Sequence, residues 1–456
     1  MFLNQKRSLI VLVLCSVGFG ISAQIIDAHY KNNQPKENSP FSSIGLGNLA
    51  PQYYAISSAM GGLSAGFRDI SSLNFENPAA STALRITAFE VGLYAKNNTI
   101  SSGDGAAATS ASGNLSYLAL GFPTYSSINE LLDRTDRKFR WSMGFALTPF
   151  STVGYNVVTQ QNHPATDTAQ VLGYEIGSGG AYKILWNNGV QYKNLSLGLN
   201  LGYVFGNMSY DKQLTFNNLN NSFSNLYNQD YSIKGLTYAL GAQYDISLGT
   251  STKDKPSTKH LILGVYGNPA TNFTTVSSSS LRVVSSISTG TDTINTLNSI
   301  TGNGKLPSSF TAGFMYENIG KLRLGAQYTV SQWSQYQNDA RPTSSNLSDS
   351  YQLSLGGEYV PNANSYKGNK LRYRLGFTTG TDPRNSGGSQ LQSFSITSGI
   401  GFSFIDRQQG LVSSINLGLE YGKLSNSASA LSEQYIKLNL GITLNDNTWF
   451  MKRRYQ

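Results

Sequence analysis

The sequence predicts an all-β protein, a transmembrane antiparallel β-barrel of about fourteen strands with an N-terminal plug, or hatch. Three observations support this fold class. Long segments alternate apolar residues with small or polar ones, the pattern of a strand with two different faces. Only 13% of the residues are charged, against about 25% in ordinary soluble domains. The chain also opens with an export leader, and a barrel is the β-structure that satisfies its backbone groups in lipid.

The leader is the first element. Lys6 and Arg7 precede an apolar run from Leu9 to Gly20, and small residues lead up to Ala23. A basic start, a short apolar core and a small-residue end are typical of a signal peptide. The run is too short for a spanning helix, which needs about 20 apolar residues. We therefore predict a signal peptide over residues 1–23, cleaved after Ala23, and secretion to the outer membrane of a Gram-negative bacterium.

The cysteine content and the net charge limit the reactions and the binding partners expected of the exported chain. The single cysteine, Cys15, lies inside the leader, so the exported chain is expected to have no disulfide and no thiol chemistry. The net charge of +9 falls to +7 when Lys6 and Arg7 leave with the leader. This excess is spread along the chain, which favours contact with outer-membrane lipid over nucleic-acid binding.

The barrel is predicted over residues 86–446. Its clearest strand places Ile436, Leu438 and Leu440 on one face and Lys437 and Asn439 on the other. The predicted strands are 86–97, 113–123, 139–150, 171–187, 194–208, 229–248, 257–276, 307–318, 320–337, 350–361, 370–382, 391–405, 411–424 and 434–446. Fourteen is an even number, as single-chain bacterial barrels require. Most of the segments are long enough for the roughly 9–11 residues of a membrane strand.

The connections between these strands alternate in length, and long loops face outward in such barrels. The outer loops would be 98–112, 151–170, 209–228, 277–306, 338–349, 383–390 and 425–433. The inner turns are short, with a very tight one near Gly320, except 124–138, where 128–132 suggest a short helix. Residues 447–456 are expected to form a periplasmic tail, with Trp449 in the interfacial aromatic girdle. A soluble β-sandwich would also alternate, but strand length and aromatic content favour the barrel.

Residues 24–85 show no alternation and are predicted to form the hatch. Glycines and small residues gather there at Gly61, Gly62 and Gly66, and the segment ends on Asn77-Pro78-Ala79. Small residues allow tight packing in a confined lumen, and wide barrels are often plugged.

The sequence resembles the FadL family of outer-membrane transporters for long-chain fatty acids and other hydrophobic compounds. The resemblance is carried first by the hatch motif, Gly61, Gly62, Gly66, Asp69, Asn77, Pro78 and Ala79. It is carried also by Leu306-Pro307 at the start of one strand, by Trp333-Ser334 near the end of the next, and by the strand count.

The resemblance implies a hatch inside the barrel and a kink in the third strand that opens the wall. A hydrophobic ligand would leave sideways through that gap into the membrane. Burial of each methylene group gains about 0.8 kcal/mol, which favours an apolar route over an aqueous pore. The third predicted strand contains Pro149-Phe150, and proline cannot donate to a β-ladder. Pro149 and Phe150 are therefore candidates for the kink, the alternative being that Pro149 merely ends the strand.

Ligand contacts do not transfer residue by residue from the family. Alternation points Arg372 and Arg374 into the lumen, where they could meet a ligand carboxylate. The alternative, which we favour, is that they pair with Glu358 or Glu420.

The sequence favours no enzyme, cofactor or metal site. The three histidines, His29, His163 and His260, fall in segments predicted to be far apart, which argues against a shared catalytic or metal site.

Two functions remain, since a fold does not fix its function. The leading one is passive uptake of a hydrophobic small molecule. The alternative is a non-transporting barrel that serves as a structural or docking subunit for other outer-membrane proteins in an export or assembly complex, as the resemblance also allows.

Overall fold

The computed structural model describes residues 37–103, 105–133, 137–162, 170–216, 223–249, 257–285, 291–342, 346–361, 370–406, 411–428 and 431–449. All of them belong to one compact unit, Pro35–Gln456. The leader and residues 24–36 of the predicted hatch lie outside the described residues. Among the described residues, no helix is long and apolar enough to cross a membrane.

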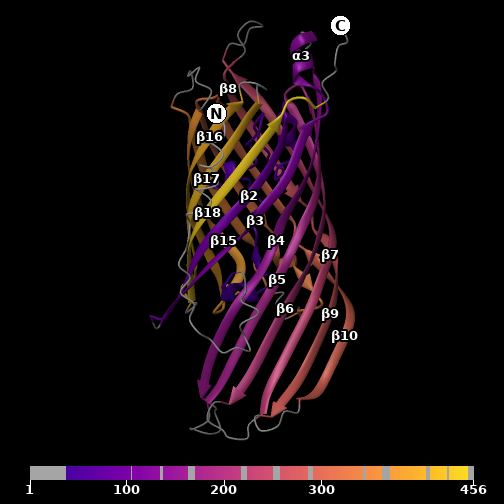
Figure 1. Cartoon of the computed structure of the whole chain (residues 1–456), viewed down its shortest axis with the longest axis vertical. Helices are drawn as coiled ribbons and strands as arrows, with labels where there is room; N and C mark the ends of the chain where they lie inside the picture. The colour runs from indigo at the N-terminus through magenta and orange to yellow at the C-terminus, as the bar shows by residue number, and fades with distance from the viewer. Residues whose placement is uncertain are drawn as a thin grey trace, which may run out of the picture. The chain divides into compact units, whose positions relative to one another are not determined.

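Fourteen wall strands form a closed antiparallel barrel (Figure 1). These fourteen wall strands are built from sixteen strand segments, because two of them are bent and interrupted. The segments are β2 (Thr87–Ser102), β3 (Ala107–Pro123), β4 (Phe139–Asn162), β5 (Gln170–Tyr192), β6 (Leu195–Phe216), β7 (Phe223–Leu248), β8 (Lys259–Asn268), β9 (Thr271–Ser285), β10 (Thr291–Leu306), β11 (Ser309–Asn318), β12 (Leu322–Ser331), β14 (Ser350–Tyr359), β15 (Lys370–Ser386), β16 (Ser389–Asp406), β17 (Leu411–Ser425) and β18 (Leu431–Asp446). Two prolines explain why sixteen strands make fourteen. Pro269 separates β8 from β9 and Pro307 separates β10 from β11, so each pair is one bent wall strand.

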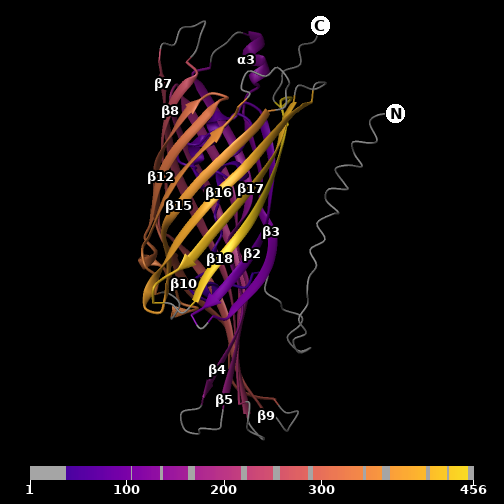
Figure 2. The same cartoon turned by 90° about the vertical axis from the view of Figure 1, so that its left-hand side faces the viewer.

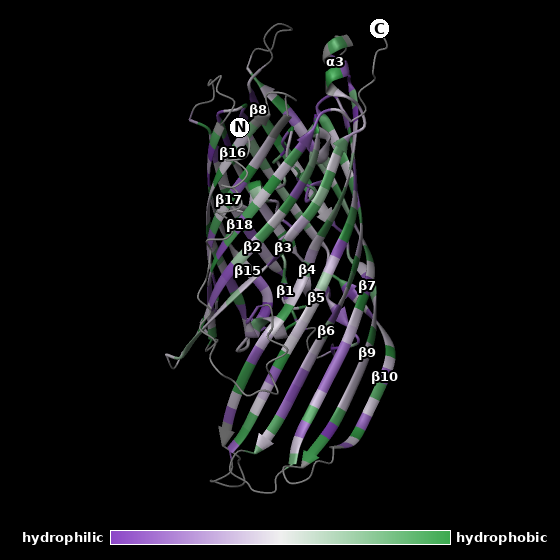
Figure 3. Ribbon diagram, in the orientation of Figure 1, coloured by the Kyte–Doolittle hydropathy of each residue, from purple (hydrophilic) through white to green (hydrophobic). Residues whose placement is uncertain are grey.

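The ring closes where the last strand, β18, pairs with the first wall strand, β2, from Leu431↔Ser102 to Asp446↔Thr87. Alternation then sorts the side chains. Leu417 and Leu438 are about half exposed and point outward, whereas Asn416 and Asn439 are buried. Hydrophobic and hydrophilic residues are interspersed along the strands of the barrel (Figure 3).

The remaining elements are short. They are η1 (Pro40–Ser43), β1 (Asn48–Leu49), α2 (Ala55–Ser58), η2 (Pro78–Ala83), α3 (Ser127–Asp133), η3 (Trp333–Gln335) and β13 (Gln337–Asn338). α3 is the short helix predicted within 124–138, and Gly320 makes the predicted tight turn with a positive φ of 72°. The prediction of strand over 320–337 was wrong at its end. After Ser331 the backbone turns into η3, so Trp333 packs inward in the core cluster.

Several strands run well beyond the predicted bounds. β4 continues to Asn162 instead of residue 150, and the predicted outer loop 277–306 is mostly the β9–β10 hairpin. The parts of β4, β5, β6, β7, β9 and β10 that continue past the closed ring (153–162, 170–179, 207–216, 223–235, 273–285 and 291–303) are called the outer extension here (Figures 1 and 2). Its sequence is rich in Ser, Thr and Asn. The predicted strands therefore covered only parts of it, such as 171–179 and 229–235.

Candidate functional site: the barrel interior and the β3–β4 seam

Residues 37–86, called the N-terminal segment here, contact inward-facing side chains of the wall. Gln327 of β12 accepts hydrogen bonds from the backbone N–H groups of Ser64 (2.7 Å) and Ala65 (3.1 Å) and donates one to the carbonyl of Gly62 (2.9 Å). Gln243 of β7 donates to the carbonyl of Ala65 (2.8 Å). These two glutamines, on wall strands β7 and β12, hold the middle of the N-terminal segment by hydrogen bonds to its backbone.

Glycines let the backbone of the N-terminal segment approach the backbone of the barrel wall closely. Gly61 and Gly62 have φ values of 68° and 74°, which an L side chain rarely adopts. On the wall, a Cβ added at Gly264 would lie 1.8 Å from the carbonyl oxygen of Ala65, and one at Gly376 would lie 2.0 Å from the Gly61 nitrogen. A Cβ added at Gly66, in the segment itself, would lie 2.7 Å from the nitrogen of Met315. The wall and the segment are therefore matched at the backbone.

The Asn77-Pro78-Ala79 motif begins η2. The Asn77 side chain accepts a hydrogen bond from the N–H of Ala79 (3.1 Å) and donates one to Ala65 (2.8 Å). Ala79 is completely buried. A Cβ at Gly198 of β6 would lie 2.2 Å from the carbonyl carbon of Pro78. The motif thus caps a turn that rests on a glycine of the wall.

Asp69 anchors a charged layer between the segment and the wall. Arg323 of β12 lies 3.0 Å from its carboxylate and Arg372 of β15 lies 3.8 Å away. Burial disfavours the charged form of Asp69, but these arginines outweigh it and lower the pKa of Asp69 to about 2. Glu358 of β14 lies at 3.2 Å from Arg323 and 3.7 Å from Arg372.

The same layer places the two lumen arginines. Arg374 is 2% exposed, forms an ion pair with Glu358 at 2.8 Å and donates to Asn416 at 2.9 Å. Arg372 meets Asp69 and Glu358. Of the two pairing partners considered from sequence, Glu358 is the one they contact. Glu420 instead accepts a hydrogen bond from Tyr435 (2.8 Å).

The wall has a seam between β3 and β4. The two strands pair from Pro123↔Ser142 to Leu118↔Leu147 and no further, although both continue. Just beyond this point the pairing of β4 with β5 shifts register between Pro149 and Ser151. Proline has no N–H to donate at such a break.

The N-terminal segment covers the edge of β4 that the seam leaves without β3. β1 pairs with β4 through Leu49↔Ser151 and Asn48↔Thr152. Ala50 donates to the carbonyl of Phe150 (3.0 Å), and Gln52 donates to that of Pro149 (2.8 Å). Phe150 also packs against the core cluster around Tyr155 and Tyr210. At Pro149 and Phe150, β4 thus exchanges a wall partner for an interior one.

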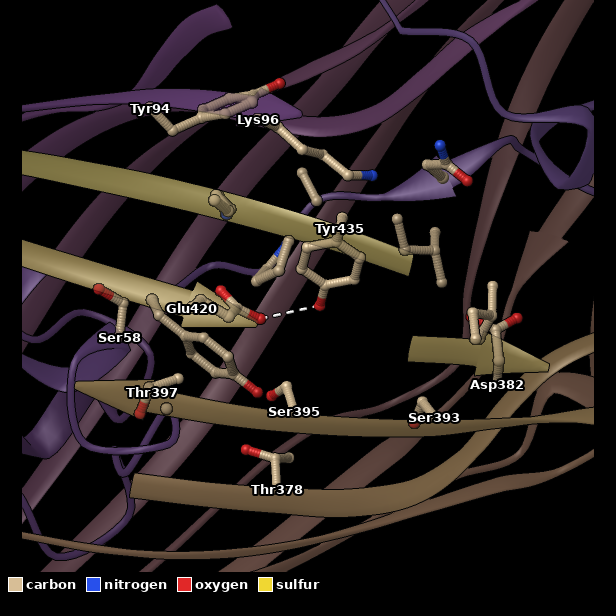
Figure 4. A pocket seen from close by; sticks show the side chains of 18 of the residues that line it. Ser58, Tyr94, Lys96, Thr378, Asp382, Ser393, Ser395, Thr397, Glu420 and Tyr435 are labelled. Carbon is tan, nitrogen blue, oxygen red and sulfur yellow. Dashed lines mark hydrogen bonds between the residues drawn. The ribbon is translucent and has the colours of Figure 1, made fainter. Parts of the chain in front are cut away.

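Charged side chains contribute to the lining of three of the cavities in the described part of the chain. The first, about 270 Å³, lies between the N-terminal segment and strands β2, β16, β17 and β18, with Lys96, Asp382 and Glu420 in its lining (Figure 4). The second, about 860 Å³, lies at the end of the barrel that carries the short turns. The third, about 70 Å³, has Glu76 and Lys183 in its lining.

Several residues that position the segment were not singled out from the sequence. Gln243, Gln327 and Arg323 each face inward by alternation, which was the available signal. Their partners lie some 180 to 260 residues away in the chain, at Asp69 or Ala65, and no local pattern indicates such contacts.

Solved structures share this fold. They include the CymD monoaromatic hydrocarbon channel (16% identity, TM-score 0.52, covering 88% of this chain and 99% of that chain). The Pseudomonas putida toluene transporter TodX is similar to the same extent (16%, TM-score 0.53, 88% and 99%). A Pseudomonas aeruginosa FadL homologue matches with 14% identity and a TM-score of 0.52, covering 89% of this chain and 98% of that chain. No curated protein matches this sequence significantly.

Fourteen antiparallel strands that close into a ring define a β-barrel with the fold of these hydrocarbon channels and of the FadL homologue. More narrowly, the chain belongs to the BamG family, whose model matches residues 9–456 and so spans the N-terminal segment and the barrel together.

Proposed function

We propose that this protein is a membrane-embedded docking subunit of a larger outer-membrane complex, with the N-terminal segment as a permanent plug. Membership of the BamG family supports outer-membrane partners. We also propose that residues 1–23 are a signal peptide, which directs export and is then cleaved.

The observation that carries the proposal is the network of buried hydrogen bonds and ion pairs that fixes the N-terminal segment to the wall. The segment is held by glutamine side chains and by the Asp69–Arg323–Glu358 layer. An apolar ligand entering there would have to displace buried ion pairs, and an unpaired buried charge costs several kcal/mol. The interior is therefore better suited to rigidity than to the passage of an apolar molecule.

The outer extension supports the same function. Six strands continue beyond the closed ring, and β10 from Asp292 to Thr301 is exposed on both faces. A transport pore does not need such a projecting sheet, whereas a docking subunit benefits from a rigid surface outside the membrane.

The test is purification of the full chain from outer membranes in mild detergent, with mass spectrometry of proteins and lipids. We expect other outer-membrane proteins in fixed stoichiometry and no dominant small hydrophobic ligand. Recovery of the barrel alone, in repeated preparations with chemically cross-linked cells, would contradict the proposal.

A second candidate function, uptake of a hydrophobic small molecule with lateral exit, is favoured by the β3–β4 seam and by the fold shared with hydrocarbon channels. In this function the ligand leaves past Pro149 and Phe150 after the N-terminal segment moves away from β4.

A disulfide across the seam separates the two functions. Leu49 and Ser151 are paired neighbours on β1 and β4, so Leu49→Cys with Ser151→Cys should lock the segment to the wall. We expect toluene or fatty-acid uptake by cells to be the same with the lock oxidised or reduced, and complex formation to persist. Uptake that stops on oxidation and returns on reduction would favour the channel; the Ser151→Cys single variant is the control.

A further inference from the structure

One face of the outer extension continues the surface that faces the lumen of the barrel, and it is called the inner face here. Tyr210 of β6 packs in the core cluster with Tyr155 and Tyr231. Tyr210 is paired with Gly177 of β5 and with Gln229 of β7. Directly paired residues of neighbouring strands share a face of the sheet, and faces alternate along each strand. Every second residue outward from these positions therefore belongs to the inner face.

Other parts of this chain cover the base of the inner face. Leu46 of the N-terminal segment belongs to the same core cluster as Tyr210, and so do Trp333 and Tyr336, in and just after η3. Arg341 lies over the ring of Tyr210 at 3.6 Å. Farther out, the strands of the extension project beyond the rest of the described barrel (Figure 2).

Beyond this cover, the inner face exposes large apolar side chains. The register assigns them to it, because Tyr227 is paired with Leu281 of β9, and Leu297 of β10 with Ser279 on the same face of β9. Each of the following side chains is between 37% and 60% exposed: Leu214, Phe223, Tyr227, Leu297 and Ile300. Apolar side chains that gather on one exposed face are typical of a protein interaction site.

The charged groups of this exposed region nearly neutralise each other. Lys212 forms an ion pair with Glu175 at 2.6 Å, across the pairing of β5 with β6. Among the described residues, Asp292 near the tip of β10 is the remaining charge that the register places on the exposed inner face. One net negative charge disfavours phosphate-bearing lipid headgroups and suits an uncharged apolar partner surface.

The exposed region has the size of a protein interface. Six strands at a spacing of about 4.8 Å make it about 24 Å wide, and the stretch of β7 from Phe223 to Gln229 is about 23 Å long. The projected area is therefore about 550 Å², and the accessible area of a corrugated face is larger. One partner of a stable protein complex contributes about 800 Å².

We propose that the inner face binds a protein at the cell exterior through an uncharged apolar patch of that protein. The proposal rests on the proposed function and names the surface that the complex uses. Long loops face outward in outer-membrane barrels, which puts the extension outside the cell. The acyl chains of the bilayer surround the ring of strands, whereas the inner face points toward the barrel axis and lies beyond the ring.

The test is photo-cross-linking of the full chain in intact cells. The photoreactive residue benzoylphenylalanine replaces Leu297 on the inner face or, as the matched control, its neighbour Thr296 on the opposite face. Both positions are exposed. We expect one discrete protein adduct from position 297, at least tenfold weaker from position 296, and degraded by a protease added to intact cells.

A second substitution then tests the apolar contact itself. Leu214→Asp adds a charge to the inner face, and Val158→Asp makes the same change at an exposed position of the opposite face. Neither side chain is buried, so both variants should fold. We expect the adduct from position 297 to fall about tenfold with Leu214→Asp and to persist with Val158→Asp.

Other occupants give different results, and each would overturn the proposal. A second copy of this chain would give an adduct of twice its mass. Surface lipid or glycan would give an adduct that stains for lipopolysaccharide and contains no second protein. Equal adducts from positions 296 and 297 would show that the inner face has no special role.

Purification from outer membranes separates this inference from the proposed function. If the wild type recovers partner proteins and the Leu214→Asp variant recovers the same set, the inner face is not the docking surface and the subunit function stands. If the wild type recovers none, the subunit function itself fails.

Discussion

At the scale of single residues, buried charge decides what the interior can do. Asp69 belongs to the hatch motif, yet its glycine neighbours gave no hint that it meets Arg323 and Arg372. The two guanidiniums keep it ionised although it is 5% exposed. The motif therefore combines backbone freedom at its glycines with an electrostatic anchor at its aspartate.

Asp69→Asn should reduce stability at neutral pH. The folded state lowers the pKa of Asp69 from 3.8 to about 2, so the ionised form stabilises the fold above pH 4, and this contribution is lost as the pH falls through 2. The shift corresponds to about 2 kcal/mol. Urea denaturation of the protein in micelles should show this loss at pH 7 and a smaller one near pH 2.5.

The matched control for that measurement is Asp292→Asn, the same change at an exposed position of β10. It should leave the denaturation midpoint unchanged. An equal loss in both variants would show that the ion pairs of Asp69 contribute nothing specific.

At the scale of elements, glycines of the wall set how closely the N-terminal segment packs. Gly264→Ala would place a methyl group 1.8 Å from a backbone oxygen, whereas Gly418→Ala would place one 3.6 Å from its nearest neighbour, the Ala59 side chain. We expect Gly264→Ala to loosen the segment and increase its cleavage by an added protease, and Gly418→Ala to behave as wild type. Equal protection of both variants would mean that the wall tolerates the clash.

The elements differ in how well they can be predicted from the sequence. The fourteen wall strands, the tight turn at Gly320 and the short helix α3 follow from periodicity and connection length, because lipid on one side enforces a local pattern. Much of the outer extension, such as the β9–β10 hairpin beyond residue 276, is rich in Ser, Thr and Asn and carries no such pattern. The pairing of Asn48 and Leu49 with β4 joins residues about 100 positions apart, and local periodicity carries no information about it.

At the scale of the whole molecule, we expect the outer extension to face the cell exterior and the short turns, such as the one at Gly320, to face the periplasm. Asn298→Cys on β10 should react with a membrane-impermeant maleimide on intact cells. Lys321→Cys in the β11–β12 turn should react only after the outer membrane is permeabilised. The sole natural cysteine, Cys15, lies in the predicted leader, so we expect a low background, and the reverse labelling pattern would overturn the orientation.

The closure of β18 on β2 has a consequence for biogenesis. The ribosome makes residues 37–86 first, and the strand that completes the ring last. An empty cylinder that closed early would have to be threaded afterwards by a segment whose contacts reach β5, β7, β12 and β16. The order of synthesis favours the opposite course, in which the wall strands assemble around the N-terminal segment and the pairing of β18 with β2 then closes the barrel.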